Sequence, residues 1–530
     1  MLAARVLAEQ GDPTGDAPPD PDAVLRISKR VVSEGSVRSG EATGDIGPDD
    51  ARALLRAWTS AVGLDARNGE LIALTQEDDF SHAALARRAR RVHERLLAEA
   101  VEEALGAARN GGGYEPAIRS LFTSSVPVVP YVPAATFLGR EKAKLATREG
   151  EPRRVVLVVD GAGSMHGVTR TLAQIRERGV PGYEVEVIRT DPNVDRRLPA
   201  VAEVEMPFYA GLGLGIPSVA ALTETIAEGR YELVHLASPG PTGVAAALIA
   251  HIGGIPTVGS YHTELAAYAG LRSGDSQLEW GMRTALALFY GSCEAVLSPS
   301  IAADRSLAEL GIEPTRILRW SRGVDTSSFD PGLRDPEAYP GELRVLYAGR
   351  LTREKGVDLL ADSFLAAHRR DPRLHLLLAG GGPEQDALRE RLGDTATLLG
   401  WLEGRELGRA YASANVFLFC SETDTFGQVI IEAQASGLPV VAVNAGGPAS
   451  LISDGETGRL CPSDPGAIAT AVVEFAASET VRGRLAWRAL AEARGRTPER
   501  ALSELAAGYA QALEWAGAVE PAPAGIRRAA

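Results

Sequence analysis

The feature that most constrains the fold is an alternation of short apolar segments and longer amphipathic segments, which begins near Arg154 and restarts near Glu342. The short segments, such as RVVLVV and LRVLYA, are almost wholly apolar, which is typical of strands buried on both faces of a parallel sheet. The segments between them carry apolar residues at helical spacing. Two runs of alternating strands and helices predict two doubly wound, Rossmann-like α/β domains.

The expected domain boundaries follow from where this alternation starts, stops and restarts. Before it, 1–50 is rich in Gly, Pro, Asp and Ser, and the pattern from about 49 to 108 is helical. His82 and His93 of this helical region are expected to be surface residues, and the proline-rich Val126–Phe137 to be an extended connector. The predicted parts are a flexible leader over 1–50, a helical accessory region and connector over 51–150, a first domain over 151–320, a linker over 321–342, a second domain over 343–500, and a helix and tail over 501–530.

Charge and cysteine content narrow the class of protein. The chain has 55 basic and 69 acidic residues and a net charge of −14, which makes nucleic acid an unfavourable partner. Its cysteines, Cys293, Cys420 and Cys461, show no C-x-x-C spacing, which argues against a zinc site or a disulfide framework. The N-terminus does not read as a signal peptide, and no apolar stretch approaches the length of a membrane span. We therefore expect a cytoplasmic protein, with peripheral contact at the inner membrane face left open.

A basic turn follows the first strand of the second domain. In AGRLTREKG, Arg350 and Lys355 lie between the strand and the start of a helix. Two cations beside the positive end of a helix dipole suit an anion such as a diphosphate. The alternative is a solvated basic loop whose charge is balanced by Glu354. Doubly wound sheets bind ligands at the carboxyl ends of their strands, so this turn faces the expected cleft between the domains.

Three acids are close together in SETDTFGQVIIEAQASG, namely Glu422, Asp424 and Glu432. They could be catalytic groups, metal ligands or the solvated ends of a strand and a helix. Asp424 lies in the loop after a strand, and Glu432 lies about two turns into the next helix. Gly427 would allow a ligand to approach the free backbone N–H groups of the first helical turn. An acid at this position is also a common helix cap, so both interpretations stay open.

Further candidates also follow predicted strands. The loop DGAGSMHG contains Gly163, but its third glycine is Gly167, one residue too late for a dinucleotide-binding G-x-G-x-x-G. AGGGP places Gly380–Gly382 at a strand end, where a nucleotide could approach the backbone. His262 ends another strand and faces the expected cleft, although a lone histidine is more often structural. These candidates, the basic turn and the acids all follow strand ends, in both domains, which favours a shared site.

Four segments occur in the order and spacing of a known family: AGRLTREKG, AGGGP, TDTFGQVIIEAQASGLPVVA and GGPASLISDGETGRL. From about Arg154 to Trp515, the chain resembles the retaining glycosyltransferases of the GT-B fold in glycosyltransferase family four. The resemblance implies two domains facing across a cleft, with acceptor binding over 151–320, donor binding over 343–500 and a mainly helical N-terminal extension. It implies transfer of a hexose from a nucleotide-diphosphate sugar, GDP-mannose or a UDP-hexose such as UDP-glucose, to a lipid, glycan or small-molecule acceptor. The nucleotide sugar is then a co-substrate, and no cofactor or metal is expected.

The resemblance also implies a role for each candidate residue. Arg350 and Lys355 would hold the diphosphate and stabilise the departing charge, and His262 would contact the transferred sugar, which makes these three the expected catalytic residues. Asp424 stands where the family most often has Glu as the sugar contact, so its reach is one methylene shorter and the neighbouring Glu422 is a fallback. The remaining donor-binding residues are Glu432 for the ribose hydroxyls, the backbone of Phe426, Gly427, Gln428 and Val429 for sugar and phosphate, Gly163 for the phosphates, and Gly380 and Gly381 for the nucleotide.

Two rival functions fit the same architecture. A sugar phosphorylase or an epimerase could use two such domains, but we find no convincing Schiff-base lysine for a phosphorylase that uses pyridoxal phosphate. A non-catalytic nucleotide-sugar-binding module would keep the binding residues and lack turnover, whereas Arg350, Lys355 and Glu432 favour activity. The variable loops that would read the acceptor, around Met165–Thr171 and Ala266–Asp275, do not identify it.

Overall fold

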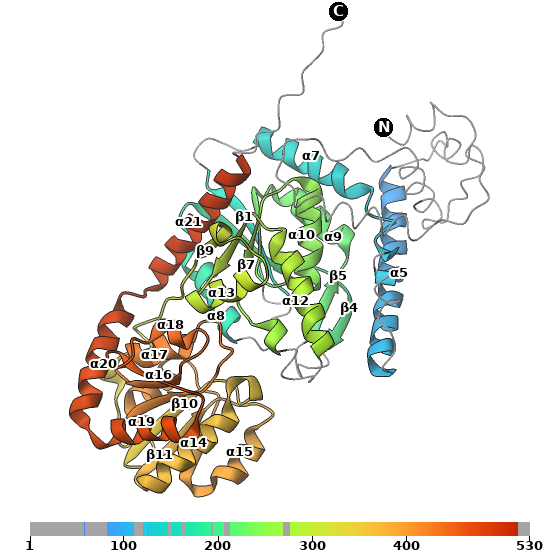
Figure 1. The fold of residues 1–530 in the computed structure, drawn as a ribbon. Helices are drawn as coiled ribbons and strands as arrows, with labels where there is room; N and C mark the ends of the chain where they lie inside the picture. The colour runs from blue at the N-terminus through green and yellow to red at the C-terminus, as the bar shows by residue number, and fades with distance from the viewer. Residues whose placement is uncertain are drawn as a thin grey trace, which may run out of the picture.

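The structure is a computed structural model with two α/β lobes, coloured green and orange in Figure 1. It describes Trp58 and residues 82–110, 120–121, 123–146, 151–160, 166–191, 194–205, 213–268 and 276–517. The predicted leader over 1–50 lies outside the described residues. Within the described ranges, no helix is both long enough and apolar enough to cross a membrane.

The first lobe is built on a seven-stranded sheet in which all neighbouring strands are parallel, as predicted. In sheet order the strands are β3 (Arg196–Arg197), β2 (Tyr183–Arg189), β1 (Arg153–Val158), β6 (Leu233–Leu236), β7 (Thr257–Ser260), β8 (Ala295–Ser298) and β9 (Ile317–Arg319). The helices between them are α8 (His166–Arg178), α9 (Val219–Gly229), α10 (Pro241–Gly253), α12 (Ser276–Gly291) and α13 (Ile301–Glu309), with the 3₁₀ helix η1 (Pro314–Arg316). The central strands are buried along their length, because helices cover both faces of the sheet.

The second lobe repeats this plan on a six-stranded parallel sheet. Its strands, in sheet order, are β12 (Ala396–Gly400), β11 (Leu374–Ala379), β10 (Leu343–Ala348), β13 (Val416–Phe419), β14 (Val440–Val443) and β15 (Gly458–Cys461). Its helices are α14 (Val357–Arg370), α15 (Gln385–Leu392), α16 (Gly404–Ser413), α17 (Gln428–Ala435), α18 (Pro448–Leu451), α19 (Pro465–Ala477) and α20 (Glu479–Arg494), with η2 (Pro331–Leu333), η3 (Arg353–Lys355) and η4 (Gly393–Thr395). In both sheets the strand order reverses beside the first strand, and this switch point positions ligands in doubly wound folds.

The N-terminal region is helical, but part of its prediction was wrong. Helix α7 (Tyr131–Ala146) replaces most of the expected extended connector, because Pro133 lies in the first turn, where its missing N–H is not needed. Helix α5 (His82–Asn110) lies where a helix was predicted. His93 is buried rather than exposed: its ring bonds the carbonyl of Ser124 at 2.7 Å and accepts the N–H of Val219 at 3.1 Å. This histidine therefore links α5 to the first lobe.

A small antiparallel pair was not predicted. Strands β4 (Ala200–Glu205) and β5 (Gly213–Pro217) form a separate two-stranded sheet beside α5 and α10. The central register pairs Glu203 with Gly215. The pair lies between β3 and α9 in the chain and takes no part in the main sheet.

The chain crosses between the lobes twice. The first crossing follows β9, and the second precedes α21 (Pro498–Gly517), which leaves the orange lobe and runs along the green one (Figure 1). The two crossings touch, since Val324 N–H donates to the carbonyl of Arg496 at 2.9 Å. A Cβ at Gly323 would lie 2.4 Å from the nitrogen of Pro498. Residues of α21 that complete the core of the first lobe are Leu502, Leu505, Tyr509 and Ala512.

Candidate active site

A cavity of about 520 Å³ lies between the lobes, where the carboxyl ends of both sheets meet. We call this cavity the cleft. The first lobe contributes Thr171, Ala173, His262, Thr263, Tyr268 and Pro299, and Arg322 lies at the first crossing. The second lobe contributes predicted site residues, namely Arg350, Lys355, Gly380, Asp424, Phe426, Gln428, Val429 and Glu432. The structure thus brings these predicted residues together with His262, while Gly381 and Gly427 are chain neighbours of lining residues and Gly163 lies outside the described residues.

The loop that carries Lys355 is fixed against the loop that carries the acids. Gly356 has a φ of 68°, and a Cβ there would lie 2.1 Å from the carbonyl oxygen of Cys420. Two hydroxyls of the acid loop, Ser421 Oγ and Thr423 Oγ1, donate to the carbonyl of Glu354 at 2.9 and 3.1 Å. Only glycine allows so close an approach with this backbone conformation. Strand β13 and the start of α14 therefore hold the two loops in a fixed relation.

Lys355 and Asp424 form an ion pair at the centre of the cleft. Lys355 Nζ lies 2.6 Å from Asp424 Oδ2, and each side chain is 16% exposed. Asp424 Oδ1 accepts the N–H groups of Phe426 at 3.1 Å and Gly427 at 2.8 Å. Burial favours the neutral carboxyl, but Lys355 and the two N–H groups outweigh it and hold the pKa of Asp424 below its usual range. Burial likewise opposes the charged amine, but Asp424 outweighs it and raises the pKa of Lys355.

Arg350 is the second cation of the cleft. Its Nη2 lies 3.6 Å from Glu354 Oε1, and the Glu354 side chain is 1% exposed. Burial lowers the pKa of Arg350, while Glu354 and Asp424 oppose that shift. The predicted balancing role of Glu354 is therefore present, yet Arg350 itself lines the cleft and is not a solvated loop residue. The site therefore holds two cations, Arg350 and Lys355, near two carboxylates, Glu354 and Asp424. An anionic ligand would compete with these carboxylates for the two cations.

His262 approaches the cleft from the first lobe. Its Nδ1 accepts a hydrogen bond from Arg322 Nη2 at 2.6 Å, and its carbonyl accepts the Thr425 hydroxyl at 2.7 Å. Burial lowers the pKa of His262 well below its usual value, and the neighbouring Arg322 and His235 lower it further. The histidine is therefore neutral at physiological pH. Ser300 Oγ also bonds the carbonyl of Thr425 at 2.6 Å, so the lobes meet in direct contact beside this histidine.

Glu432 and Gln428 lie one turn apart on α17. The Glu432 side chain is buried and lines the cleft, and its Oε2 accepts the Tyr411 hydroxyl at 3.2 Å. Gln428 Nε2 donates to the carbonyl of Gly323 at 3.1 Å, which connects α17 to the first crossing. Residues four apart share one helix face, so Glu432 is directed to the same cleft as Gln428. A buried carboxylate of this kind suits a ligand that offers hydroxyl donors.

Glycines at the ends of β10 and β11 serve close packing. Gly380 has a φ of 136°, and a Cβ there would lie 1.9 Å from the carbonyl oxygen of Gly349. A Cβ at Gly381 would lie 2.8 Å from Trp401 Nε1. The glycines therefore allow two loops and an indole to meet at the edge of the cleft. Their predicted contact with a nucleotide stays a prediction.

The glycine loop after β1 begins at Asp160. Asp160 Oδ1 accepts the N–H of Thr242 at 2.6 Å, and Oδ2 accepts the N–H of Gly243 at 3.2 Å and the Ser238 hydroxyl at 2.9 Å. This carboxylate therefore occupies the N-terminus of α10. The predicted phosphate contact at Gly163 lies outside the described residues.

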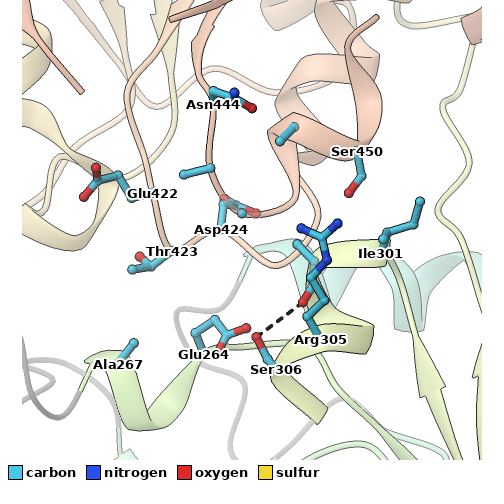
Figure 2. A pocket seen from close by; sticks show the side chains of 14 residues that line it. Glu264, Ala267, Ile301, Arg305, Ser306, Glu422, Thr423, Asp424, Asn444 and Ser450 are labelled. Carbon is cyan, nitrogen blue, oxygen red and sulfur yellow. Dashed lines mark hydrogen bonds between the residues drawn. The ribbon is translucent and has the colours of Figure 1, made fainter. Parts of the chain in front are cut away.

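Glu422 lies in a different cavity. Figure 2 shows this cavity of about 440 Å³, in which Glu422 and Asn444 of the second lobe face Glu264 and Arg305 of the first. Glu422 Oε1 accepts the Ser463 hydroxyl. Asp424 lines both cavities, but Glu422 does not line the cleft. Asp424 is therefore the acid that meets Lys355.

The metal-ligand interpretation of the three acids has no supporting geometry. In the part of the chain that the structure describes, no group of three or more His, Cys, Asp and Glu side chains is arranged to share a metal ion. Glu422, Asp424 and Glu432 instead meet Ser463, Lys355 and Tyr411, respectively.

The sequence-based prediction missed two cleft residues, Arg322 and Trp401. Arg322 follows β9 and its guanidinium lies 4.1 Å from the centre of the Trp320 ring. Trp401 follows β12 and is 53% exposed although it lines the cleft. Both come directly after strands, which was the signal used for the other candidates. Arg322 was overlooked because it lies in a segment that reads as a linker.

Buried histidines predict acid sensitivity. Burial lowers the pKa of His235 to about 3, and Arg322 adds to the shift. The unfolded chain binds a proton near pH 6.5 that the folded chain excludes, so stability falls as pH drops from about 6.5 towards 3. The slope from one such histidine reaches about 1.4 kcal/mol per pH unit. His235→Gln should therefore flatten the fall in melting temperature between pH 7 and 5.

The matched control is His251→Gln, which removes an exposed histidine from the end of α10. Its pH dependence should follow that of the unmodified protein. If the melting temperature of His235→Gln fell with pH as steeply as that of the unmodified protein, His235 would not be a source of the acid sensitivity. His262 acts in the same direction, so some slope should remain in the variant.

Two doubly wound domains, with a cation-bearing cleft at the facing ends of their strands, form the architecture of the GT-B class. Two family models match this chain: Glycosyltransferase Family 4 over residues 166–328 and Glycosyl transferases group 1 over residues 342–478. The GDP-mannose-dependent alpha-mannosyltransferase of Corynebacterium glutamicum is 32% identical over 333 residues, which cover 58% of this chain and 76% of that protein. The protein of the same description from Mycobacterium tuberculosis is 34% identical, over 58% of this chain and 84% of its own. The chain belongs to glycosyltransferase family 4.

Solved structures agree on the fold. Sucrose-phosphate synthase from Thermosynechococcus elongatus has a TM-score of 0.55 at 22% identity and covers 68% of this chain and 98% of its own. Anabaena Alr3699/HepE in complex with UDP and glucose has a TM-score of 0.53 at 20% identity, over 68% of this chain and 99% of its own. The GT-B architecture predicted from the sequence is thus confirmed.

Proposed function

We propose that this protein transfers a mannose-type hexose from GDP-mannose to a lipid, glycan or small-molecule acceptor, with retention of anomeric configuration and without a metal ion. The observation that carries the proposal is the meeting of Lys355, Arg350, Glu432 and His262 in one cleft between the lobes. The relatives of about one-third identity that are described as GDP-mannose-dependent support the choice of donor. A UDP-hexose is the second candidate, because Anabaena Alr3699/HepE has the same fold and was solved with UDP and glucose.

The distribution of charge suggests how the donor would lie. The diphosphate would lie at Arg350 and Lys355, beside the start of α14, and the ribose hydroxyls would meet Glu432. The sugar would then extend towards His262 and Asp424, where both lobes contribute. Breaking the sugar–phosphate bond builds negative charge on the diphosphate and positive charge on the sugar. Fixed cations at the diphosphate therefore stabilise the transition state more than the ground state.

Retention of anomeric configuration is supported by the hydrogen bonds that already occupy the Asp424 carboxylate. Both of its oxygens are occupied, one by Lys355 and the other by the N–H groups of Phe426 and Gly427. A carboxylate held in this way is a poor nucleophile for a glycosyl-enzyme intermediate, which would need a carboxylate close to the sugar carbon. We infer that the acceptor hydroxyl attacks from the same face as the departing phosphate, which takes its proton.

The preference for guanine or uracil in the donor nucleotide can be tested at Glu403. Trp401 and Glu403 line one part of the cleft, and an indole beside a carboxylate suits a guanine, whose N1–H and N2–H groups can both donate to one carboxylate. Uracil offers only one N–H donor. Glu403→Gln should therefore raise the KM for GDP-mannose by about tenfold and change that for UDP-glucose by less than about twofold. Steady-state release of GDP and UDP gives both values.

Glu406→Gln is the control for Glu403→Gln, because Glu406 is exposed in the first turn of α16, just after Glu403, and does not line the cleft. Its kinetics should match those of the unmodified protein. An equal rise in the KM for GDP-mannose and for UDP-glucose would mean that Glu403 does not distinguish guanine from uracil.

Nucleotide release with a panel of donors tests the function itself. The protein is incubated with GDP-mannose, GDP-glucose, UDP-glucose or UDP-N-acetylglucosamine, with and without EDTA. Release of GDP from GDP-mannose, unaffected by EDTA and faster with an acceptor extract, is the expected result. Ligand-induced stabilisation without release from any donor would instead favour a binding module. NMR of the product's anomeric carbon reports retention or inversion.

We also propose a cytoplasmic protein with peripheral contact at the inner membrane face. Helix α7 supports such a contact, because Phe137, Leu138 and Leu145 are exposed on it alongside Arg140 and Lys142. Exposed apolar side chains with neighbouring cations are typical of helices that lie on anionic lipid. Sedimentation with vesicles of phosphatidylglycerol, compared with phosphatidylcholine, tests this contact.

A further inference from the structure

Arg322 is a cleft residue to which neither the sequence nor the resemblance gives a role. It lies just after β9, at the first crossing between the lobes. Its guanidinium lies over the Trp320 ring, with 4.1 Å between the guanidinium carbon and the ring centre. Stacking on an indole fixes the plane of a guanidinium, which is otherwise free to rotate. Arg322 is thus held in one orientation at the cleft wall.

The orientation of Arg322 determines the state of His262. Arg322 Nη2 lies 2.6 Å from His262 Nδ1. A guanidinium has only donors, so Nδ1 must be the acceptor and must carry no proton. In a neutral imidazole the proton then lies on Nε2. This contact selects one of the two neutral tautomers and excludes the doubly protonated ring.

Other charged and titratable groups around His262 favour the same state. From β6, His235 stays neutral because burial lowers its pKa to about 3, and its ring bonds the Tyr509 hydroxyl at 2.7 Å and the Ser260 hydroxyl at 2.5 Å. Burial lowers the pKa of Arg322 to about 9, and the Glu504 carboxylate of α21 opposes that shift, so the guanidinium stays charged at neutral pH. Among the described residues, no carboxylate bonds the imidazole of His262, so nothing there stabilises a positive ring.

Good packing alone does not explain an arginine at this position, because one of its guanidinium nitrogens has no hydrogen-bond partner among the described residues. This nitrogen, Nη1 of Arg322, is buried. Burying an unpaired donor of a charged group is unfavourable, and such groups are rare in folded proteins. A methionine would fill similar space without this penalty. An arginine at this position is therefore better explained by what it does to His262 than by the stability of the fold.

We propose that Arg322 is a positioning residue for glycosyl transfer, which holds His262 neutral with its proton on Nε2. This inference rests on the proposed function, in which His262 contacts the transferred sugar. In that role an Nε2–H group donates to a sugar hydroxyl without placing a positive charge beside a sugar that becomes positive in the transition state. A protonated ring would oppose that charge, and the other tautomer would offer no donor at Nε2.

The protonation state of His262 can be measured without turnover. Histidine ring nitrogens are labelled with ¹⁵N, and His262→Gln identifies the signals by their loss. The unmodified protein should show a protonated Nε2 and an unprotonated Nδ1 from pH 8 to pH 6. Arg322→Met should show mixed tautomers, and protonation of the ring should begin at a higher pH than in the unmodified protein, because one of the causes that lower the pKa of His262 is gone while its burial stays. An unchanged His262 spectrum in Arg322→Met would overturn the proposal.

Kinetics show whether the histidine transmits the effect to the reaction. Arg322→Met should lower kcat for the donor by about tenfold to a hundredfold and change the donor KM by less than about threefold. As pH falls, its activity should also begin to decline at a higher pH than that of the unmodified protein, because removal of the cation raises the pKa of His262. Arg322→Gln, whose amide can still donate to Nδ1, should recover part of kcat. The matched control Arg319→Met removes a cation on β9 that pairs with Asp304, and should be near normal.

A double-mutant cycle separates an indirect role from a direct one. If Arg322 acts through His262, the His262→Gln/Arg322→Met variant should be no slower than His262→Gln alone. Fully additive losses, or a rise in donor KM without a fall in kcat, would overturn the proposal in favour of direct ligand contact. Absence of transfer by the unmodified protein would contradict the proposed function, whereas the NMR result would still decide what Arg322 does to His262.

Discussion

Replacing Lys355 with alanine is expected to lower kcat by more than about a hundredfold, the scale found when one transition-state donor is removed. Lys355 is held within 2.6 Å of Asp424 and faces the cleft where the diphosphate would lie. An ammonium group has three donors, and Asp424 accepts one of them. Stabilisation of the departing diphosphate by the others would be lost with the side chain. Initial rates of GDP release at saturating donor measure this effect.

The control for Lys355→Ala must separate catalysis from folding. Removing Lys355 leaves the Asp424 carboxylate without its cation, and an orphaned buried charge costs about 3–5 kcal/mol. Lys355→Ala/Asp424→Asn removes both charges and should recover much of the melting temperature while kcat stays low. Arg353→Ala removes a cation two residues away that is 76% exposed and pairs with Glu384. It should keep its activity within about twofold. Near-normal turnover by a folded Lys355→Ala variant would exclude the catalytic role.

Glu432→Gln is expected to raise the donor KM by between about tenfold and a hundredfold, with a smaller change in kcat. The side chain is buried in the cleft, and its Oε2 accepts the hydroxyl of Tyr411 at 3.2 Å. Hydrogen bonds to a charged group contribute about 1.5–3 kcal/mol, which corresponds to this range of affinity. Ribose hydroxyls are present on GDP as well as on the donor. Calorimetric titration with GDP should therefore show the same loss as the KM.

Glu422→Gln is the matched control, because it makes the same chemical change in the second cavity. Its donor KM and GDP affinity should stay within about twofold of the unmodified values. A loss at Glu422 equal to that at Glu432 would mean that the ligand lies in the second cavity. Unchanged GDP affinity in Glu432→Gln would instead remove the ribose contact.

The sequence was most informative where one kind of pattern dominated. Strands β10 and β11 are apolar except for Arg344 and His375, and both were predicted in the correct sheet type because such runs are buried on two faces. Prolines misled the prediction around Pro133, since a proline in the first turn of a helix looks like a proline in an extended segment. The position of α21 was not predicted either. Its amphipathic pattern shows that one face is buried, but not which of the two lobes it covers.

The cleft shows the same division between local and long-range information. Asp424 and Glu432 were found because their spacing and the adjacent helix start are local features. The contact between His262 and Arg322 joins residues 60 positions apart, and only the folded sheet brings the ends of β7 and β9 together. Glu422 could not be separated from Asp424 by sequence, because two residues on one loop can face different cavities.

The return of α21 to the first lobe makes the second lobe an insertion within the first, since both joints lie side by side at Gly323–Val324 and Arg496–Pro498. An exchange of second lobes between relatives therefore needs two junctions rather than one. A chimera cut only at the first joint would bring a foreign last helix, which must fit beside Leu297, where Gly508 leaves no room for a side chain. A chimera cut at both joints keeps its own last helix, and the first lobe then remains a complete folding unit.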